Sequence, residues 1–248
     1  MPRPSLSVQL YTVREALAAD AAGTLARLAA LGLRAVEPFG LVEQAAVLRP
    51  LLAETGLAAP TSHASLVDAD LDAVLAAAAA LGVETVIEPA VGPERWHDRE
   101  AIAGIAAALA EASRRAADLG LRVGYHNHWW ETEIRLDGVP AIEVLAELLP
   151  EAVLLEVDVY WAAVGGTEPV ALLERLGERV GAIHVKDGPI SRDTARQLPA
   201  GAGAMPIAEI LAAAPAARPV LEFDEYAGDL FEGLAAGIAH LSGLGVSA

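Results

Sequence analysis

The amino-acid sequence predicts an α/β protein built as a single-domain (β/α)₈ (TIM) barrel over residues 1–248. Strand-like apolar segments alternate with helix-like segments eight times, the order expected of a parallel sheet covered by helices. A length of 248 residues matches such a barrel, and no linker or change in composition divides the chain. An open, doubly wound sheet is the structural alternative, but the chain carries no glycine-rich phosphate-binding fingerprint to accompany it.

The predicted strands are short runs rich in apolar residues. Polarity alternates in residues 5–11, so that Val8 and Leu10 would face one side of the sheet while Gln9 and Tyr11 face the other. The predicted strands cover residues 5–11, 34–37, 57–63, 84–88, 121–126, 153–158, 180–186 and 219–223.

Capping residues bound the predicted helices. Asp20 stands before the first helical pattern as an N-cap, and glycines follow several patterns, among them Gly56, Gly82 and Gly120. The predicted helices cover residues 20–31, 42–55, 71–81, 98–119, 140–149, 169–176, 206–213 and 230–241.

Composition narrows the range of functions. The formal net charge of −17 argues against a nucleic-acid partner, because binding a polyanion relies on clustered Lys and Arg. The longest apolar stretches are about half of the ~20 residues that a membrane span needs, and the N-terminus lacks the features of a secretory signal. We therefore expect a cytoplasmic protein with no membrane partner. Because the chain has no Cys, any bound metal is expected to have nitrogen and oxygen ligands.

The stretch LRVGYHNHWWE, residues 121–131, concentrates polar and aromatic side chains in a chain with only six His and four Trp. A strand that ends at His126 places this imidazole at the C-terminal end of the barrel, where catalytic groups gather. Three later strands end in Asp158, His184 and Glu222. Because buried carboxylates need a compensating cation, we interpret these four residues as ligands of one divalent metal ion. Taken singly, each histidine could instead be a hydrogen-bonded packing residue.

Three more polar residues lie at predicted strand ends. Glu37 and His63 are expected to anchor substrate hydroxyls. Glu88 is a further substrate-binding candidate, because Pro89 requires an extended backbone there and so fits the end of a strand. The sequence does not show whether its side chain faces the substrate.

Lys186 follows His184 by two residues and therefore shares its face of the strand. It is expected either to reach the substrate or to form a salt bridge with Glu156 or Asp187. Glu156 points the same way as Asp158 but lies deeper in the barrel, so we expect it to be structural.

Aromatic residues cluster near the expected site. Trp129, Trp130 and Trp161 are candidates for a wall on which a sugar stacks, with core capping as the alternative. His128 is a further substrate-binding candidate, and Asp224 is expected to be solvated at the rim.

These residues and their order resemble the sugar phosphate isomerase/epimerase family, the xylose-isomerase-like barrels that also include inosose dehydratase and endonuclease IV. The likeness covers nearly the whole chain through the motifs SVQLYTVRE, AVEPFG, SHASL, GYHNHWWE, EVDVYWAAVGG, IHVKDG and LEFDEY. The resemblance implies one divalent ion, most often Mn²⁺ with Mg²⁺, Co²⁺ or Zn²⁺ as alternatives, at the ends of strands five to eight. The matching positions are His126, Asp158, His184 and Glu222.

Two positions depart from the family's pattern. Better-known epimerases have a glutamate where this chain has His126, and that glutamate forms an acid/base pair with the last ligand. Glu131 or His128 could supply the missing base. Many relatives have a histidine where this chain has Trp161. The larger ligand set that endonuclease IV needs for three metals is incomplete here.

The resemblance and the site together predict a metal-dependent sugar isomerase or epimerase, which removes a proton beside a carbonyl and stabilises an enediolate. Glu222 is the expected base, with His126 or Glu131 as its partner and Lys186 as a further catalytic candidate. The alternatives are a dehydratase or lyase acting on a keto-inositol or 3-keto sugar, and a non-catalytic sugar-binding protein. Because few basic residues lie near the expected mouth of the barrel, we expect the substrate to be a small unphosphorylated sugar or polyol. A homo-oligomer is possible, and the sequence does not decide it.

Overall fold

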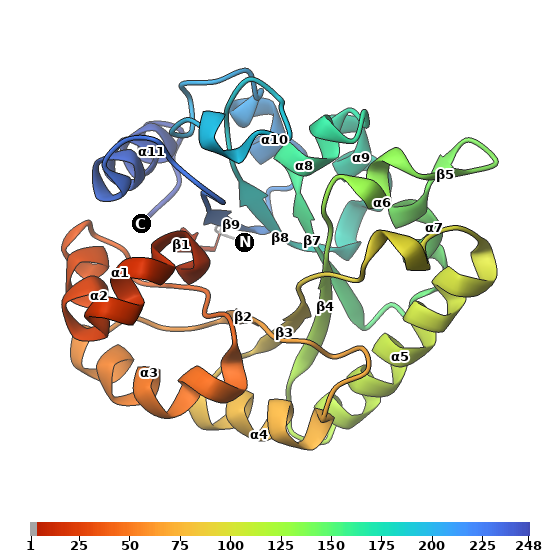
Figure 1. The fold of residues 1–248 in the computed structure, drawn as a ribbon, viewed down its shortest axis with the longest axis horizontal. Helices are drawn as coiled ribbons and strands as arrows, with labels where there is room; N and C mark the ends of the chain where they lie inside the picture. The colour runs from red at the N-terminus through yellow and green to blue at the C-terminus, as the bar shows by residue number, and fades with distance from the viewer. Residues whose placement is uncertain (1–3) are drawn as a thin grey trace.

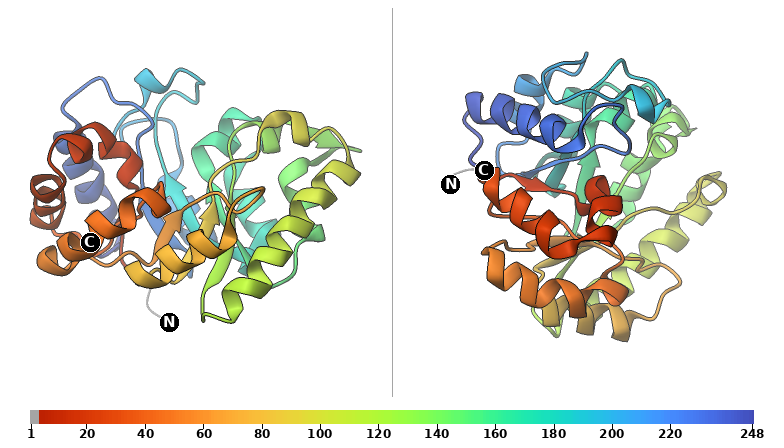
Figure 2. Two further views of the ribbon diagram at one scale, coloured as in Figure 1. Left: turned by 60° about the horizontal axis from the view of Figure 1, so that its bottom comes forward. Right: turned by 60° about the vertical axis from the view of Figure 1, so that its left-hand side comes forward.

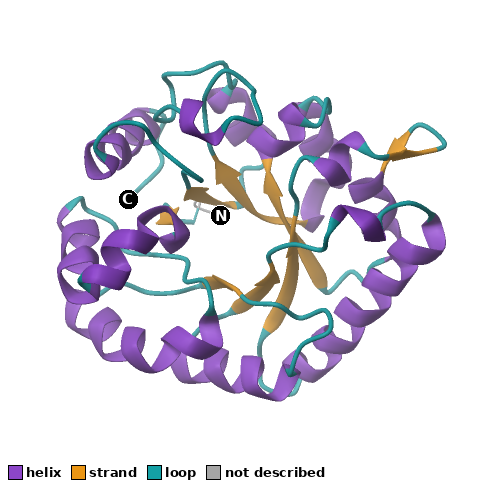
Figure 3. Ribbon diagram, in the orientation of Figure 1, coloured by secondary structure: helices purple, strands orange, loops and turns teal. Residues whose placement is uncertain are grey.

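Seven strands form one curled parallel sheet in the computed structural model, which describes residues 4–248. Neighbours in the sheet follow the order β1-β9-β8-β7-β4-β3-β2, so the last strand pairs with the first. The strands are β1 (Ser7–Val8), β2 (Thr61–His63), β3 (Thr85–Glu88), β4 (Arg122–His126), β7 (Val153–Asp158), β8 (Val180–Val185) and β9 (Arg218–Leu221). They stand inside a ring of helices (Figure 1, Figure 3).

Residues 34–37 fill the gap between β1 and β2 and close the barrel. They pair through isolated parallel bridges, Gln9 with Glu37 on one side and Ala35 with Ala58 on the other. The predicted pairing of the first strand with the last is confirmed, since Ser7 lies opposite Val220 in a parallel register. The closed (β/α)₈ barrel is therefore confirmed and the open sheet is excluded.

The predicted helices are all present, with ends that differ from the predictions by at most a few residues. Side chains of Asp20, Asp98 and Asp229 accept hydrogen bonds from backbone N–H groups at helix starts, as expected of N-caps. These helices are α2 (Ala21–Ala30), α3 (Leu41–Thr55), α4 (Leu71–Leu81), α5 (Arg99–Ala117), α7 (Ala141–Leu148), α9 (Pro169–Leu176), α10 (Ile207–Ala213) and α11 (Leu230–Gly243). The turned views of Figure 2 show them around the barrel wall. No helix within residues 4–248 is long and apolar enough to cross a membrane.

Two predicted strands are wrong over part of their length. Residues 5–11 form a strand only at Ser7–Val8, because the Gln9 side chain accepts from Tyr11 N and starts a 3₁₀ helix, Leu10–Val13. Tyr11 consequently lies 42% exposed. In residues 57–63, regular pairing begins only after Pro60, which has no N–H to donate to the ladder.

Several short elements that the sequence did not predict lie between the main strands and helices. They are the helices α1 (Arg14–Ala19), α6 (Trp130–Glu133) and α8 (Val159–Val164), the hairpin β5 (Arg135–Leu136) and β6 (Val139–Pro140), and three 3₁₀ turns, Pro93–Arg95, Gly177–Arg179 and Thr194–Arg196. Asp158 explains one of them, because its side chain accepts from Trp161 N at 2.8 Å and caps α8.

Alternation along β7 separates the core from the candidate site. Val153, Leu155 and Val157 belong to the hydrophobic core between the barrel wall and the helices. Glu156 and Asp158 occupy the other face of the strand, inside the barrel, and both are buried.

Candidate active site

The ends of the parallel strands bring the predicted polar residues together at one end of the barrel. His63 ends β2, His126 ends β4 and Asp158 ends β7, while His184 lies one residue before the end of β8 and Glu222 directly follows β9. Each is at most 8% exposed. Because all the strands run in the same direction, the side chains share one face of the barrel.

A carboxylate that the sequence analysis placed outside the site stands at its centre. Glu156 Oε2 lies 2.6 Å from His63 Nε2, 3.0 Å from His184 Nε2 and 3.2 Å from His126 Nδ1. Although burial opposes ionisation, His184 and His63 hold the pKa of Glu156 well below its usual value. Its position two residues before Asp158, on the same strand face, is the signal that could have identified it.

Glu37, in the bridging segment 34–37, completes this cluster. Its Oε1 accepts from Gln9 Nε2 at 2.8 Å and lies 2.9 Å from His184 Nε2, and its Oε2 accepts from the Thr61 hydroxyl. Burial and the neighbouring Glu156 raise the pKa of Glu37. The side chain is therefore held from several sides.

A second group of charges surrounds the ammonium of Lys186. Its Nζ lies 2.8 Å from Glu222 Oε2, 2.9 Å from Asp158 Oδ2 and 2.8 Å from Asp224 Oδ2. His184 Nδ1 lies 2.6 Å from the same oxygen of Glu222. Against the effect of burial, Lys186 and His184 hold the pKa of Glu222 well below its ordinary value, whereas burial raises the pKa of Asp158 to about 6.

Asp224 differs from its expected place at a solvated rim. Its side chain is 22% exposed and accepts from Lys186 Nζ and, at 2.7 Å, from Gln197 Nε2. It therefore belongs to the charge network around Lys186.

The donor atoms fit a divalent metal ion. Ligand atoms of Asp158, His184 and Glu222 lie within 4.8 Å of one another, and a second set joins His184 to His63, His126 and Glu156. Three of the four predicted ligands thus meet directly, and His126 Nε2 lies 3.9 Å from Asp158 Oδ2. Asp158 Oδ2 is buried and has Lys186 Nζ at 2.9 Å but no hydrogen bond of good geometry, so a metal ion there would compete with the ammonium for this oxygen. Burial and the charge of His184 lower the pKa of His126, which favours the neutral imidazole that metal binding requires. Glu156 and Glu222 raise the pKa of His184 against the effect of burial, so a metal ion at His184 would displace a proton.

Glu88 and Glu131 already have partners elsewhere. Glu88 Oε2 accepts from Leu66 N at 2.6 Å and Val67 N at 2.8 Å, which fastens the loop after β2. Glu131 accepts from the Tyr125 hydroxyl at 2.7 Å and from the backbone N–H of His128 at 2.9 Å. Burial raises the pKa of Glu131 to about 8.

Aromatic residues cover one side of the site. The rings of His128 and Trp130 stack with centroids 4.4 Å apart, and Lys186 Nζ lies 5.4 Å from the ring centroid of Trp161. His128 Nδ1 and Trp161 Nε1 are buried and have no hydrogen-bond partner in the described part of the chain.

A cavity of about 520 Å³ adjoins the histidine cluster through His63. Tyr11, Phe39, Ala64 and Pro89 also line it. Its volume lies in the range of small-molecule sites and its wall is largely apolar.

The fold and the polar centre define a (β/α)₈ barrel with a His and carboxylate site at the C-terminal ends of its strands. Residues 25–218 match the family model described as xylose isomerase-like TIM barrel, and the chain belongs to this family. Among curated proteins, none is significantly similar to it.

Solved structures share the fold over almost the whole chain. A sugar phosphate isomerase/epimerase from Parabacteroides distasonis is 21% identical with a TM-score of 0.86, over 98% of this chain and 96% of that one. The probable 3-DHS dehydratase AsbF of Bacillus anthracis is 14% identical with a TM-score of 0.77, over 96% and 99%. IolI, a protein solved with a bound zinc atom, is 14% identical with a TM-score of 0.73, over 97% and 98%.

Proposed function

We propose that the protein is a divalent-metal-dependent isomerase or epimerase of a small sugar, acting by proton transfer beside a carbonyl. The observation that carries this proposal is the buried Glu222 side chain, which contacts Lys186 and His184 in the same cluster as Asp158. A base, a cation and a metal-type donor set thus occupy one site, as removal of a carbon-bound proton requires.

Asp158, His184 and Glu222 would hold the ion, and His126 lies beside them, with its Nε2 3.9 Å from Asp158 Oδ2. When bound, it would supply Lewis-acid polarisation of the substrate carbonyl and of a neighbouring hydroxyl. We propose Mn²⁺, because a mixed nitrogen and oxygen donor set without thiolate suits it; Mg²⁺, Co²⁺ and Zn²⁺ are the alternatives to test.

We assign Glu222 as the general base. Its lowered pKa keeps the carboxylate ionised at neutral pH, so it can accept the proton from the carbon beside the carbonyl. A positioned base of this kind contributes roughly 10²–10⁴-fold to the rate. Lys186, whose pKa the surrounding carboxylates raise well above normal against the effect of burial, stays charged and stabilises the oxyanion that develops.

Epimerisation also needs a group that returns a proton to the opposite face of the carbon. We propose that His126, which lies 3.2 Å from Glu156 Oε2, takes this role instead of binding the ion, because a metal-bound imidazole has no proton to return; between turnovers it would take up a proton from solvent. Glu131 has both oxygens engaged by Tyr125 and His128, so we propose that it positions the backbone of His128 and acts on the substrate only indirectly.

The substrate would enter through the 520 Å³ cavity beside His63. We propose that His63, His128, Trp130 and Trp161 contact it, since Nδ1 of His128 and Nε1 of Trp161 lack partners. Aromatic faces suit the apolar side of a sugar ring.

Solvent deuterium exchange tests the proposal without knowledge of the product. Protein loaded with Mn²⁺ is incubated in D₂O with a panel of ketoses, keto-inositols and 3-keto glycosides, and exchange into the substrate is followed by NMR. We expect exchange into at least one compound and its loss in Glu222→Gln. Loss of water from the compound in the same spectra would assign the protein as a dehydratase. Tight binding without exchange would identify a sugar-binding protein and refute the enzyme proposal for that ligand.

A further inference from the structure

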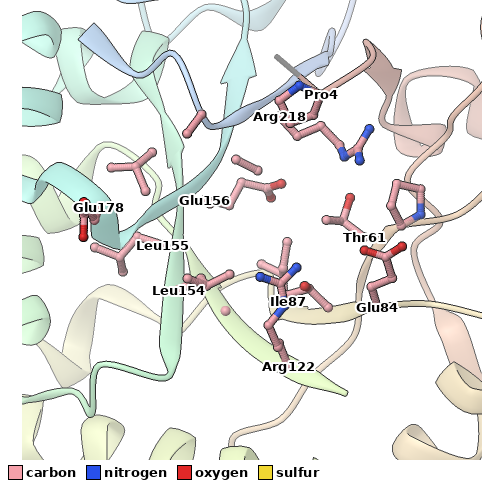
Figure 4. Close-up of a pocket in the computed structure, with 17 residues that line it drawn as sticks. Pro4, Thr61, Glu84, Ile87, Arg122, Leu154, Leu155, Glu156, Glu178 and Arg218 are labelled. Carbon is pink, nitrogen blue, oxygen red and sulfur yellow. The ribbon is translucent and has the colours of Figure 1, made fainter. Parts of the chain in front are cut away.

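A second cavity, of about 260 Å³, lies at the opposite end of the barrel (Figure 4). Thr61, Thr85, Arg122 and Arg218 line it, and these are the first residues of β2, β3, β4 and β9. The candidate active site is built at the other ends of the same strands. The cavity is therefore a separate site, open to solvent from the N-terminal face of the barrel.

Small residues leave this space inside the barrel. Gly124 and Ala182 line the cavity in the layer below the histidines, where barrels of this type normally place branched side chains that fill the interior. The volume is smaller than a drug-sized molecule needs, so the cavity suits a ligand of a few carbon atoms.

Two guanidinium groups converge on the cavity. Figure 4 shows the side chains of Arg122 and Arg218 directed toward one open space. Neither takes part in any of the arginine ion pairs within residues 4–248. Arg218 Nη1 donates to Ser5, at 2.8 Å to its carbonyl oxygen and 3.3 Å to its hydroxyl. Burial lowers the pKa of Arg218, and the charge of Arg122 lowers it further, whereas Glu84 raises it. Glu84 and Glu178 also line the cavity, but neither forms an ion pair with Arg122 or Arg218 in the described part of the chain, so both guanidinium groups are left to bind an anion.

A carboxylate oxygen without a partner forms the inner end. Glu156 lines the cavity with a side chain that is 1% exposed, and its Oε1 has no hydrogen-bond partner in the described part of the chain. Leaving a buried charged oxygen unsatisfied is costly, so a donor is expected there. A ligand hydroxyl that reaches Oε1 would provide it.

We propose that this cavity is a second ligand site, which binds a small hydroxylated anion. A carboxylate or phosphate head lies between Arg122 and Arg218, and a hydroxyl at the other end donates to Glu156 Oε1. The two planar guanidinium groups would donate hydrogen bonds to the anionic head, and Glu156 Oε1 would accept one from the hydroxyl.

Glu156 links this ligand to the candidate active site. Its other oxygen, Oε2, contacts His63, His126 and His184. A hydrogen bond to Oε1 withdraws charge from the whole carboxylate, so occupancy of the cavity changes the environment of the three imidazoles. The two sites are then coupled, and each ligand alters the affinity for the other by the same factor.

Isothermal titration calorimetry of the full chain loaded with Mn²⁺ tests the site. The probes are D-glycerate for a carboxylate head, sn-glycerol 3-phosphate for a phosphate head, and glycerol as the neutral control. We expect one or both anions to bind at one site per chain with a dissociation constant in the millimolar range or tighter, and glycerol to show no binding. The stronger of the two anions identifies the head group.

Variants locate the bound anion. Arg122→Gln, at an exposed strand start where folding is tolerant, is expected to weaken binding about tenfold or more, in line with a lost charged hydrogen bond. Arg49→Gln removes the same charge from an exposed position of α3 outside the cavity and is expected to leave binding unchanged. Asp158→Asn, which disrupts the metal site at the other end of the barrel, is expected to change the affinity for the anion only by the coupling between the two sites and not to abolish binding.

Three outcomes would overturn the proposal. The first is that neither anion binds, and the second is that Arg122→Gln binds the anion as tightly as the wild type does. The third is that Asp158→Asn loses anion binding while Arg122→Gln keeps it. The last would place the anion at the metal site. None of these results bears on deuterium exchange, so the two proposals fail independently.

Discussion

The ammonium of Lys186 lies 2.8 Å from Glu222 Oε2 inside the barrel, where both side chains are buried. This contact ties the proposed base to a permanent cation. It also places a positive charge beside the carboxylates that would hold a metal ion.

Replacement of Lys186 separates these two roles. In Lys186→Met we expect the exchange rate to fall at least ~100-fold, as on removal of an oxyanion-stabilising donor. Metal binding should be retained or tightened, because Asp158 and Glu222 lose a competing cation. Exchange assays and metal titration measure the two effects. An unchanged exchange rate would remove Lys186 from the catalytic assignment.

Asp158 is expected to be essential for metal binding. Asp158→Asn keeps an oxygen that can accept from Trp161 N and cap α8, but removes the charge that a divalent ion needs. Elemental analysis should find bound metal in the wild type and little in the variant. Asp118→Asn, at the exposed C-terminal cap of α5, is the matched control and should bind metal normally. Equal metal content in all three proteins would refute the ligand assignment.

Glu131 should make stability depend on pH. Its pKa is raised from 4.5 to about 8, so the folded state holds a proton that the unfolded state releases between these values. A raised pKa contributes stability at low pH that is lost as pH rises toward 8. In Glu131→Gln this loss disappears, so its stability relative to the wild type should improve by roughly 3 kcal/mol between pH 5 and pH 8.

Urea unfolding of both proteins at the two pH values measures this difference. Because all other titrating groups are shared, their contributions cancel in the comparison. A constant difference between the two proteins would show that the pKa of Glu131 is not raised.

Substrate contact by His128 predicts a selective kinetic defect. His128→Ala removes the half-buried ring that stacks on Trp130 and carries an unpartnered Nδ1. We expect a higher KM with a smaller change in kcat, because the lost contact is made in the ground state as well as in the transition state. A defect confined to kcat would instead place His128 in proton transfer.

Close packing around α8 predicts a stability difference between two glycines. A Cβ at Gly165 would overlap both Thr132 Oγ1 and the carbonyl oxygen of Trp129, so Gly165→Ala should lose a few kcal/mol. Gly104 lies inside α5, and no atom outside the adjacent residues and the helix's own nearby backbone lies within 4 Å of the position that an alanine methyl group would occupy there. Gly104→Ala should therefore gain about 0.5–1 kcal/mol. Denaturant unfolding of both variants checks the two signs.

The barrel itself could be predicted because its signals are local. Hydrophobic alternation, the Asp N-caps and the helix-ending glycines each depend on a few neighbouring residues, and they located the helices and the order of the strands. The errors were local as well. Gln9 caps a 3₁₀ turn with its side chain, and such a cap has no periodic signature.

The sequence also predicted that the residues at the strand ends lie close together, because parallel strands in a closed barrel must end on one face. This is why His126, Asp158, His184 and Glu222 could be grouped before any contact was known. What each side chain contacts was decided by the tertiary structure alone. Glu156 lies among three imidazoles contributed by three other strands, and its partners lie from 28 to 93 residues away in the chain.

Charge states were decided in the same way. Glu131 and Glu222 are both glutamates near the ends of strands, yet burial without a cation raises the pKa of one to about 8, and Lys186 and His184 lower the pKa of the other despite its burial. A pKa depends on the solvent exclusion and the charges within a few ångströms of the group, and residues distant in sequence supply both. The amino-acid sequence by itself therefore determined the barrel and the face that carries the site, and only the folded chain decided which groups in that site are ionised and which are paired.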